Sequence, residues 1–312
     1  MPLWGWIVLG IVAFLLLSLV GMFFATWGIA KKVYRNILVR TGPEKWTRAN
    51  SYPPNKEHTR MFDEGMAWAA AHEKKPVQIE NDGLKLAGEY FNFGGRRCVI
   101  IFPGRTESLY YSYYFAQPYA EAGCNVLVVD TRAHGLSEGK YNCCGTREWS
   151  DVIAWSRFAH DELGNDEVVL HGICVGGAGI VLAAVKPEFP AYVSHIVVEG
   201  LFATFFESFA RHMKAEKKPL FPVLYEIFLA AWLESGMKVW ESAPIRCIHK
   251  VKTPMLFLHG RQDTYSVPKQ AEKLYAKCRA PKRIVWMENG SHSHLRINNT
   301  ELYDHAIQEF LA

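Results

Sequence analysis

The sequence predicts an α/β protein, in which a mostly parallel central sheet carries helices on both faces. Short runs of aliphatic and β-branched residues recur along the chain and are continuous, which indicates strands covered on both sides. Helical segments separate these runs, as the crossover connections of parallel strands require. The chain has 312 residues, of which 49% are hydrophobic and 21% charged, and is therefore long enough to form one large core of this kind.

The chain starts with a long apolar segment. Its first thirty residues carry no charge, with Trp4 and Trp6 near one end and Trp27 near the other. A helix from Trp6 to Trp27 would be about 31 Å long, close to the thickness of the hydrocarbon core of a bilayer. A cleaved signal peptide is the alternative, but the basic leading region is missing and the apolar run is too long. We expect residues 1–30 to form a transmembrane anchor.

The charged residues indicate where the rest of the chain lies. Lys31, Lys32, Arg35 and Arg40 follow the apolar segment, so the positive-inside rule places the C-terminal part in the cytoplasm. Seven cysteines without regular spacing favour free thiols over a disulfide framework, and no C-x-x-C pair suggests zinc. The net charge of +4 is spread along the chain, which argues against a nucleic-acid partner. We expect no metal and no organic cofactor.

Residues 31–75 are predicted to be a juxtamembrane connector without chemistry of its own, containing the stretch "YPP" at 52–54 and one helix around residues 61–71. A hairpin turning at Asp82-Gly83 then opens the predicted main domain, residues 76–312. Six buried strands follow, at residues 98–102, 125–130, 167–172, 195–200, 255–260 and 283–288.

A segment rich in large apolar residues, about 201–244, interrupts this rhythm after the strand that ends near Gly200. We expect a small helical cap here. Its aromatic residues have two explanations that the sequence leaves open: ordinary packing between helices, or the lining of an apolar pocket, because insertions at this edge of the sheet lie over the active site.

Two stretches carry the frame of a nucleophile elbow, G-x-[S/C]-x-G. Ser137 lies in "HGLSEG", but the strand before it ends near Asp130 and a polar loop follows. Cys174 lies in "EVVLHGICVGGAGIVLAAV", where a strand runs directly into the motif and a helix starts at once. An elbow requires this strand, turn and helix in immediate succession. The sequence therefore predicts Cys174, and not Ser137, as the nucleophile.

From about Val77 to its C-terminus the chain resembles the α/β-hydrolase superfamily, in particular its serine aminopeptidase-like and BEM46-like branch. The stretches "DTRAHGLSEG" and "GTREWSD" carry the likeness, together with the elbow. Most relatives have serine where this chain has Cys174, but dienelactone hydrolases and polyhydroxyalkanoate synthases also have a cysteine elbow. The resemblance implies structural roles for Asp130, Ser137, Glu148 and Asp151.

The same resemblance implies the partners of the nucleophile, in the chain order nucleophile, acid, histidine. Asp263, in "HGRQDTYSVP", occupies the place of the acid, and Glu199 at the end of the preceding strand is the alternative. His292 has the expected spacing to Tyr303, and His294 is the alternative histidine. The acid would hold the imidazole in the tautomer that accepts a proton from the nucleophile.

Two backbone N–H groups are expected to form the oxyanion hole. One belongs to Val175, directly after the nucleophile, and the other to Arg105 in "IFPGRTES", where Pro103 replaces the histidine that the family motif carries. The first turn of a helix also favours the thiolate form of Cys174.

The sequence as a whole predicts a membrane-anchored hydrolase that cleaves an ester, thioester or lactone of an apolar, lipid-like acyl substrate through a thioester on Cys174. Two alternatives stay open. The same thiol could pass the acyl group to an acceptor other than water, or the fold could be a binding scaffold in which Cys174 is inert.

Overall fold

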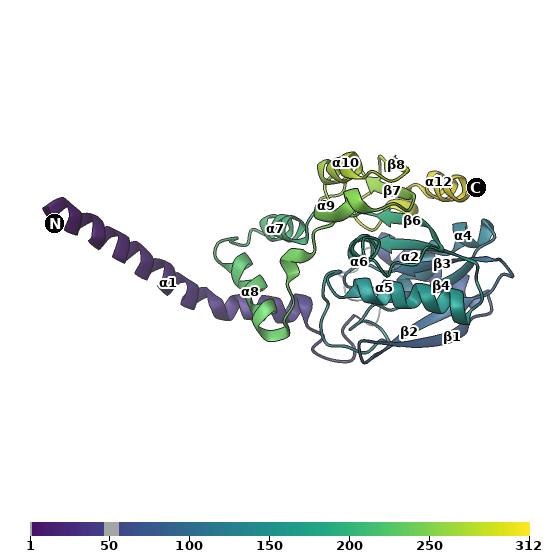
Figure 1. Ribbon diagram of the computed structural model, residues 1–312, viewed down its shortest axis with the longest axis horizontal. Coiled ribbons are helices and arrows are strands. Elements are labelled where there is room, and N and C mark those ends of the chain that lie inside the picture. Colours follow the sequence, from purple (N-terminus) through teal and green to yellow (C-terminus); the bar gives the residue numbers. More distant parts are fainter. Residues whose placement is uncertain (1, 47–55) are drawn as a thin grey trace.

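A computed structural model describes residues 2–46 and 56–312 (Figure 1). Its eight-stranded sheet has the order β1-β2-β4-β3-β5-β6-β7-β8. Strand β2 is antiparallel to β1 and β4, and the remaining pairs are parallel. The strands are β1 Lys75–Asn81, β2 Leu84–Phe91, β3 Arg97–Phe102, β4 Asn125–Val129, β5 Glu167–Ile173, β6 Val193–Glu199, β7 Met255–Gly260 and β8 Lys282–Met287.

The predicted fold class is confirmed. Strands β3 to β8 begin and end within two residues of the six predicted runs, and β1 pairs with β2 around the turn at Asp82-Gly83. Both turn residues have positive φ, 51° and 71°, which an Asp-Gly pair tolerates in a two-residue hairpin loop. The stretch at 52–54 lies outside the described residues, and the helix expected around 61–71 is α2, Lys56–Ala70.

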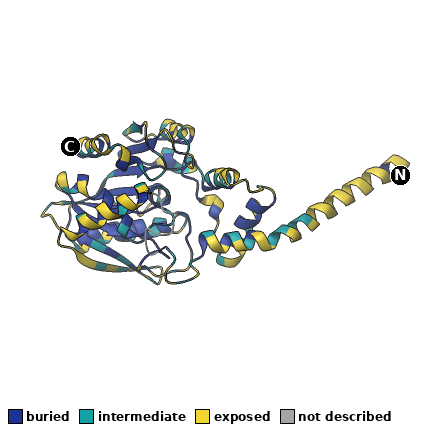
Figure 2. Cartoon of the chain, turned by 180° about the vertical axis from the view of Figure 1, so that it is seen from behind, coloured by how far each residue is buried: buried dark blue, intermediate teal, exposed yellow. Residues whose placement is uncertain are grey.

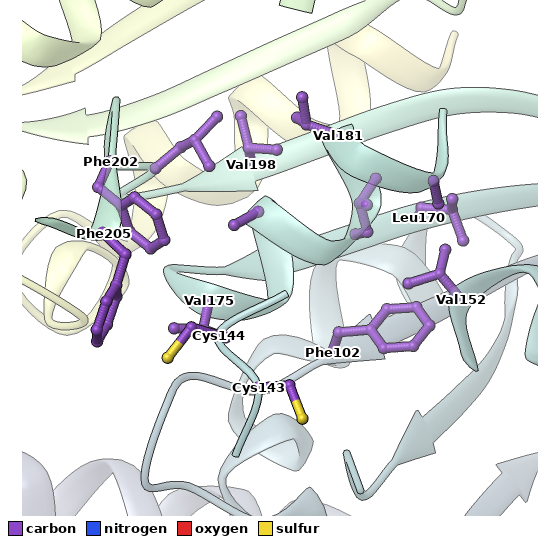
Figure 3. Close-up of a cluster of buried hydrophobic side chains, with 14 of the residues drawn as sticks. Phe102, Cys143, Cys144, Val152, Leu170, Val175, Val181, Val198, Phe202 and Phe205 are labelled. Atoms are coloured by element: carbon purple, nitrogen blue, oxygen red, sulfur yellow. The ribbon is translucent and has the colours of Figure 1, made fainter. Parts of the chain in front are cut away.

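Helices cover both faces of the sheet. Because successive residues of a strand point to opposite faces, each strand contributes side chains to two separate cores. Ile100 of β3 belongs to the core beneath α5, α6 and α10, whereas Val99 and Ile101 belong to the core beneath α2, α3, α4 and α12. Figure 3 shows part of the first core, with Phe102 and Val175 near the elbow and Phe202 and Phe205 from the segment that follows β6. The helices of both layers are α3 Leu109–Ser112, α4 Gln117–Glu121, α5 Glu148–Arg157, α6 Val175–Ala183, α9 Pro244–Cys247, α10 Pro268–Lys277, α11 Leu295–Asn298 and α12 Thr300–Leu311.

Short 3-10 or π segments complete the connections. They are Tyr113–Phe115, Phe158–Glu162, Val239–Glu241 and Ile248–Lys250.

The N-terminal helix α1, Leu3–Leu38, extends further than the thirty apolar residues of the sequence. In the part of the chain that the structure describes, it is the one helix long and apolar enough to cross a membrane, and its apolar stretch is exposed. Figure 2 shows this exposed stretch projecting from the body of the protein. Its last turns are different: Ala30, Tyr34 and Leu38 are 0–1% exposed and belong to the core.

The predicted helical cap is present between β6 and β7 as α7, Phe205–Ala215, and α8, Val223–Ser235. Thr204 caps the N-terminus of α7 by accepting a hydrogen bond from Glu207 N at 3.1 Å. Helix α8 packs against the C-terminal part of α1 (Figure 1). Thr26 donates a hydrogen bond to Glu226 at 2.7 Å, and Lys31 forms an ion pair with Glu234 at 2.8 Å.

Candidate active site

Cys174 lies in a strained turn between β5 and α6. Its backbone has φ 51° and ψ −105°, a region that residues other than glycine seldom adopt. Such a conformation costs about 1–3 kcal/mol and persists where the surroundings enforce it. Cys174 N donates to Glu199 O at 2.8 Å, which ties the turn to the end of β6.

Glycines make this turn possible. A Cβ at Gly172 would lie 2.4 Å from Gly177 N, and one at Gly176 would lie 2.4 Å from Phe102 O. Either contact is too short for any side chain, so both positions require glycine for the close approach of strand, turn and helix. The thiol of Cys174 is thereby held at the start of α6, partly exposed in a pocket.

The structure brings His292 to Asp263 and Cys174. His292 Nδ1 lies 2.7 Å from Asp263 Oδ2, and the Cys174 side chain lies close enough to the imidazole to raise its pKa. Asp263 is 3% exposed, and its Oδ1 accepts hydrogen bonds from the backbone N–H groups of Tyr265 and Ser266, both at 2.8 Å. The carboxylate is therefore fixed by three donors.

The loop that carries His292 approaches the end of β7 closely. A Cβ on Gly260 would lie 2.0 Å from Gly290 O, so only glycine allows the two segments to come together. Asp263 follows β7 and His292 follows β8, and this contact places both loops at the same edge of the sheet. The two residues meet although 29 positions separate them.

Electrostatics favour a charged arrangement at this site. Burial disfavours the imidazolium, but the Asp263 carboxylate and the Cys174 side chain raise the pKa of His292 well above its ordinary value. Burial also opposes ionisation of Asp263, yet the charge and hydrogen bond of His292 lower the pKa of this carboxyl. Both shifts stabilise an imidazolium on His292 beside the Asp263 carboxylate, as expected for an imidazole that takes up a proton during a reaction.

The alternative acid and histidine are engaged elsewhere. Glu199 is buried and accepts a hydrogen bond from Tyr303 Oη at 2.6 Å, and burial raises the pKa of Glu199 to about 7. His294 lines the pocket and its Nδ1 donates to the backbone oxygen of His292 at 2.8 Å. The structure thus brings Asp263 to His292, whereas Glu199 bonds to the last helix.

Ser137, the other G-x-S-x-G residue, does not line the pocket. It is 1% exposed, and its hydroxyl donates to Asp130 O and accepts from Ala87 N, both at 2.9 Å. Asp130 in turn accepts the N–H groups of Leu109 and Leu136 at 2.7 Å, and burial raises the pKa of Asp130 to about 7. These contacts join the loop after β4 to its neighbours.

The other two acidic residues with predicted structural roles bond within the fold. Glu148 accepts the N–H groups of Cys143 and Gly145 at 2.7 and 2.8 Å. Asp151 pairs with Arg132 at 2.6 Å, and both side chains are buried.

The loop after β3 carries the second predicted oxyanion donor. Arg105 lines the pocket, and its carbonyl accepts hydrogen bonds from His134 at 2.7 Å and Asn142 at 2.6 Å. Gly104 N donates to Glu107 at 2.8 Å. These bonds hold the loop after β3 on both sides of the Arg105 N–H. The other predicted donor, Val175, opens α6, where the first N–H groups have no acceptor within the helix.

The pocket above Cys174 has a volume of about 420 Å³, within the range of small-molecule sites. Phe202, Phe205 and Phe209 form its apolar wall, so part of the cap lines the site as well as packing within the fold. The lining residues are His58, Arg105, Glu107, Cys174, Phe202, Phe205, Ser208, Phe209, His212, Thr264, Tyr265, Ser291, His292, Ser293 and His294.

Two polar residues of the pocket, His58 and Glu107, were not predicted from the sequence. His58 comes from α2, in the connector expected to carry no chemistry, and burial with the neighbouring charge of His294 lowers the pKa of His58 to about 4. Glu107 is 4% exposed, and burial raises the pKa of its carboxyl. Glu107 lies three residues after Gly104 in the loop after β3, a signal that could have drawn attention to it. Within the described residues, no group of three or more His, Cys, Asp or Glu side chains could hold a metal ion.

Comparison with known proteins identifies the family. The sequence profile of the α/β hydrolase fold matches residues 97–221, and that of the X-Pro dipeptidyl-peptidase (S15) family matches residues 207–294. The uncharacterized protein YqkD of Bacillus subtilis is 30% identical over 218 residues, which cover 68% of this chain and 70% of that protein. The chain belongs to the α/β-hydrolase superfamily.

Other members are more distant. The α/β hydrolase domain-containing protein WAV2 of Arabidopsis thaliana is 26% identical over 200 residues, 60% of each protein. The esterase Pf2001 of Pyrococcus furiosus superimposes with a TM-score of 0.65 at 23% identity, covering 78% of this chain and 92% of that one. Acetyl xylan esterase 1 of Thermoanaerobacterium sp. gives 0.54 at 15% identity, covering 86% and 98%. Esterases are thus among the solved structures that share the fold of this α/β hydrolase.

Proposed function

We propose that this α/β hydrolase is a membrane-anchored enzyme that cleaves an ester, thioester or lactone of an apolar acyl group, with Cys174 as nucleophile, His292 as acid and base, and Asp263 as the orienting acid. The observation that carries the proposal is the contact of Cys174 and Asp263 with the same imidazole, on the wall of an apolar pocket. Similarity to YqkD and WAV2 supports a place in the BEM46-like branch.

The proposed reaction has two steps. The Cys174 thiol gives its proton to His292 as its sulfur attacks the carbonyl carbon, and the N–H groups of Val175 and Arg105 stabilise the oxyanion. The bond to the leaving alkoxide then breaks as the alkoxide takes a proton from His292. Water, deprotonated by His292, attacks the thioester in the second step, which releases the carboxylic acid and restores the thiol.

Helix α1 supports the membrane part of the proposal. Its exposed apolar stretch is longer than the roughly 20 residues needed to span a bilayer, and Lys31, Lys32 and Arg35 follow this stretch within the same helix. The positive-inside rule then places the catalytic domain in the cytoplasm. A reporter fused to the C-terminus and active on the opposite side of the membrane would contradict this orientation.

The test uses the full chain in detergent and nitrophenyl esters of increasing acyl length. Cys174→Ala is expected to lower kcat by about 10³-fold or more, because the nucleophile is lost. Ser137→Ala is the matched control and should keep kcat near the wild-type value. Hydroxylamine-sensitive acyl adducts on Cys174, found by mass spectrometry, would report the thioester. A fall in kcat with Ser137→Ala alone would contradict the assignment.

The same experiment separates the alternatives. If the thioester forms but water turns it over slowly, and added alcohols or amines accelerate turnover, the protein is an acyltransferase. If neither turnover nor adduct appears with any ester, and the chain binds acyl ligands without consuming them, it is a binding protein.

A further inference from the structure

The cap and the N-terminal helix are packed in a defined register. Thr26 of α1 bonds to Glu226 of α8, and Lys31 and Arg35 of α1 meet Glu234 at 2.8 and 3.8 Å. Residue numbers rise together in both helices, so α8 runs in the same direction as α1. The N-terminal end of α8 therefore faces the exposed apolar part of α1.

This register gives the depth of the tip of the cap. Val223, the first residue of α8, precedes Glu226 by three residues, which at about 1.5 Å per residue places it roughly 4.5 Å closer to the N-terminus of α1, near the level of Phe23. Phe221 lies in the turn directly before this end of α8. At that level α1 is exposed and apolar: Val20 is 52% exposed and Phe24 is 72% exposed. Phe221 and Tyr225, exposed by 59% and 57%, continue this apolar surface onto the cap.

Basic residues border the tip. Lys214, in the last turn of α7, and Lys217, in the segment between α7 and α8, are both exposed, and Lys218 beside Lys217 pairs with Glu216. Aromatic side chains flanked by lysines are typical of elements that lie at the surface of an anionic bilayer. The residues Leu220, Phe221 and Tyr225 are called the cap tip below.

Aromatic rings connect the cap tip to the pocket. Phe221 contacts Tyr225 with ring centroids 6.1 Å apart, Tyr225 contacts Phe206 at 5.6 Å, and Phe206 contacts Phe228 at 5.5 Å. Phe228 lies 6.3 Å from both Phe205 and Phe209, which line the pocket. A continuous apolar layer thus runs from the level of the membrane to the site of Cys174.

We propose that the cap tip is inserted into the same membrane that α1 crosses, and that the ester reaches the pocket from the lipid leaflet, so that the substrate is a membrane-resident amphiphile. This inference rests on the proposed function for its substrate and on the register of α1 and α8 for its geometry. The bilayer is the occupant of the exposed face because that face continues the apolar surface of α1 at the same depth and carries lysines beside it.

Insertion is tested by photo-crosslinking in nanodiscs of phosphatidylcholine and phosphatidylglycerol. A benzophenone amino acid replaces Phe221 or Tyr225, with Leu15 of α1 (55% exposed) as positive control and Leu302 of α12 (46% exposed) as negative control. We expect lipid adducts at 221, 225 and 15, and none at 302. Adducts at 15 alone, or protein adducts at 221, would overturn insertion of the cap. No adduct at any position would overturn the membrane anchor itself.

Entry from the leaflet is tested by kinetics. Phe221→Ser with Tyr225→Ser should lower kcat/KM about tenfold or more for an ester embedded in vesicles, because two partly exposed aromatic residues no longer bind lipid. The same double variant should leave kcat/KM for a short water-soluble ester unchanged, as should Leu302→Ser with both substrates. An equal fall with both substrates would contradict the proposal. A wild type that cleaves neither ester would contradict the hydrolase function, while the crosslinks still decide insertion.

Discussion

Asp263→Asn is the sharpest probe of the site, because the structure dictates how the amide must sit. Asp263 Oδ1 accepts two backbone N–H groups, from Tyr265 and Ser266. The asparagine must keep its oxygen there, so its NH₂ group faces His292. The imidazole then has to present the lone pair of Nδ1, which puts its proton on Nε2, and the ring can no longer accept the proton of the Cys174 thiol.

The expected loss follows from two effects. Removing the charge from the 2.7 Å hydrogen bond is worth about 1.5–3 kcal/mol, or roughly 10-fold to 150-fold in rate. The wrong tautomer adds to this, and the same substitution in a serine protease triad costs about 10⁴-fold in kcat. We expect kcat to fall about 10³-fold to 10⁴-fold. The fold should persist, because the backbone acceptor is kept.

The assay is kcat against pH with a short soluble ester. The carboxylate of Asp263 raises the pKa of His292, which must be neutral to accept a proton, so loss of the carboxylate should move the acidic limb of the profile to lower pH. Glu199→Gln is the matched control: it keeps an acceptor for Tyr303 and should retain kcat within about threefold. If the Asp263 variant keeps more than a tenth of kcat, or if both variants lose activity equally, the assignment of the acid is wrong.

Three further predictions concern the scaffold. Gly172→Ala should destabilise the protein severely or prevent folding, since its Cβ would lie 2.4 Å from Gly177 N. In the control Gly179→Ala, the new Cβ meets its nearest atom at 3.5 Å and should change the melting temperature little. Similar melting temperatures for the two variants would refute the packing argument. Ser137→Ala leaves Ala87 N and Asp130 O without their partner and should cost about 1–3 kcal/mol in urea unfolding; no loss would contradict a structural role. Burial raises the pKa of Glu199 from 4.5 to about 7, so its contribution to stability is complete below pH 4.5 and lost as pH rises to 7. Glu199→Gln should remove a decline of roughly 3 kcal/mol between those pH values, and an unchanged pH dependence of unfolding would refute this.

The elbow could be predicted because its determinants are local. A strand, a turn of small residues and a helix follow one another between Glu167 and Ala183, and the glycines that allow their close approach are visible in the sequence. Strands β3 to β8 also contain continuous apolar runs, so their limits could be placed within two residues. The partners His292 and Asp263 could be proposed only through chain order and family resemblance, because nothing local indicates that two loops meet.

Other parts of the site depend on packing between distant segments. His58 reaches the pocket because α2 lies on the face of the sheet opposite α6, and no pattern within the helix announces this. Glu107 becomes buried because the loop after β3 folds back so that Gly104 N can donate to it. Polar residues in such segments look solvated in the sequence, since only the tertiary fold decides whether water is removed from them.

The end of the N-terminal helix also depends on packing against a distant segment. The charges from Lys31 onward suggested the end of an apolar segment, yet the helix continues to Leu38 because α8 supplies a partner for its last turns. Tyr34 and Leu38 are as buried as residues of the central sheet, so this part of α1 is core and not linker. Phe228 of α8 in turn packs on Phe205 and Phe209 of the pocket wall. The position of that wall therefore depends on the packing of α8 against the last turns of α1, part of which the sequence assigned to the connector from residue 31 onward.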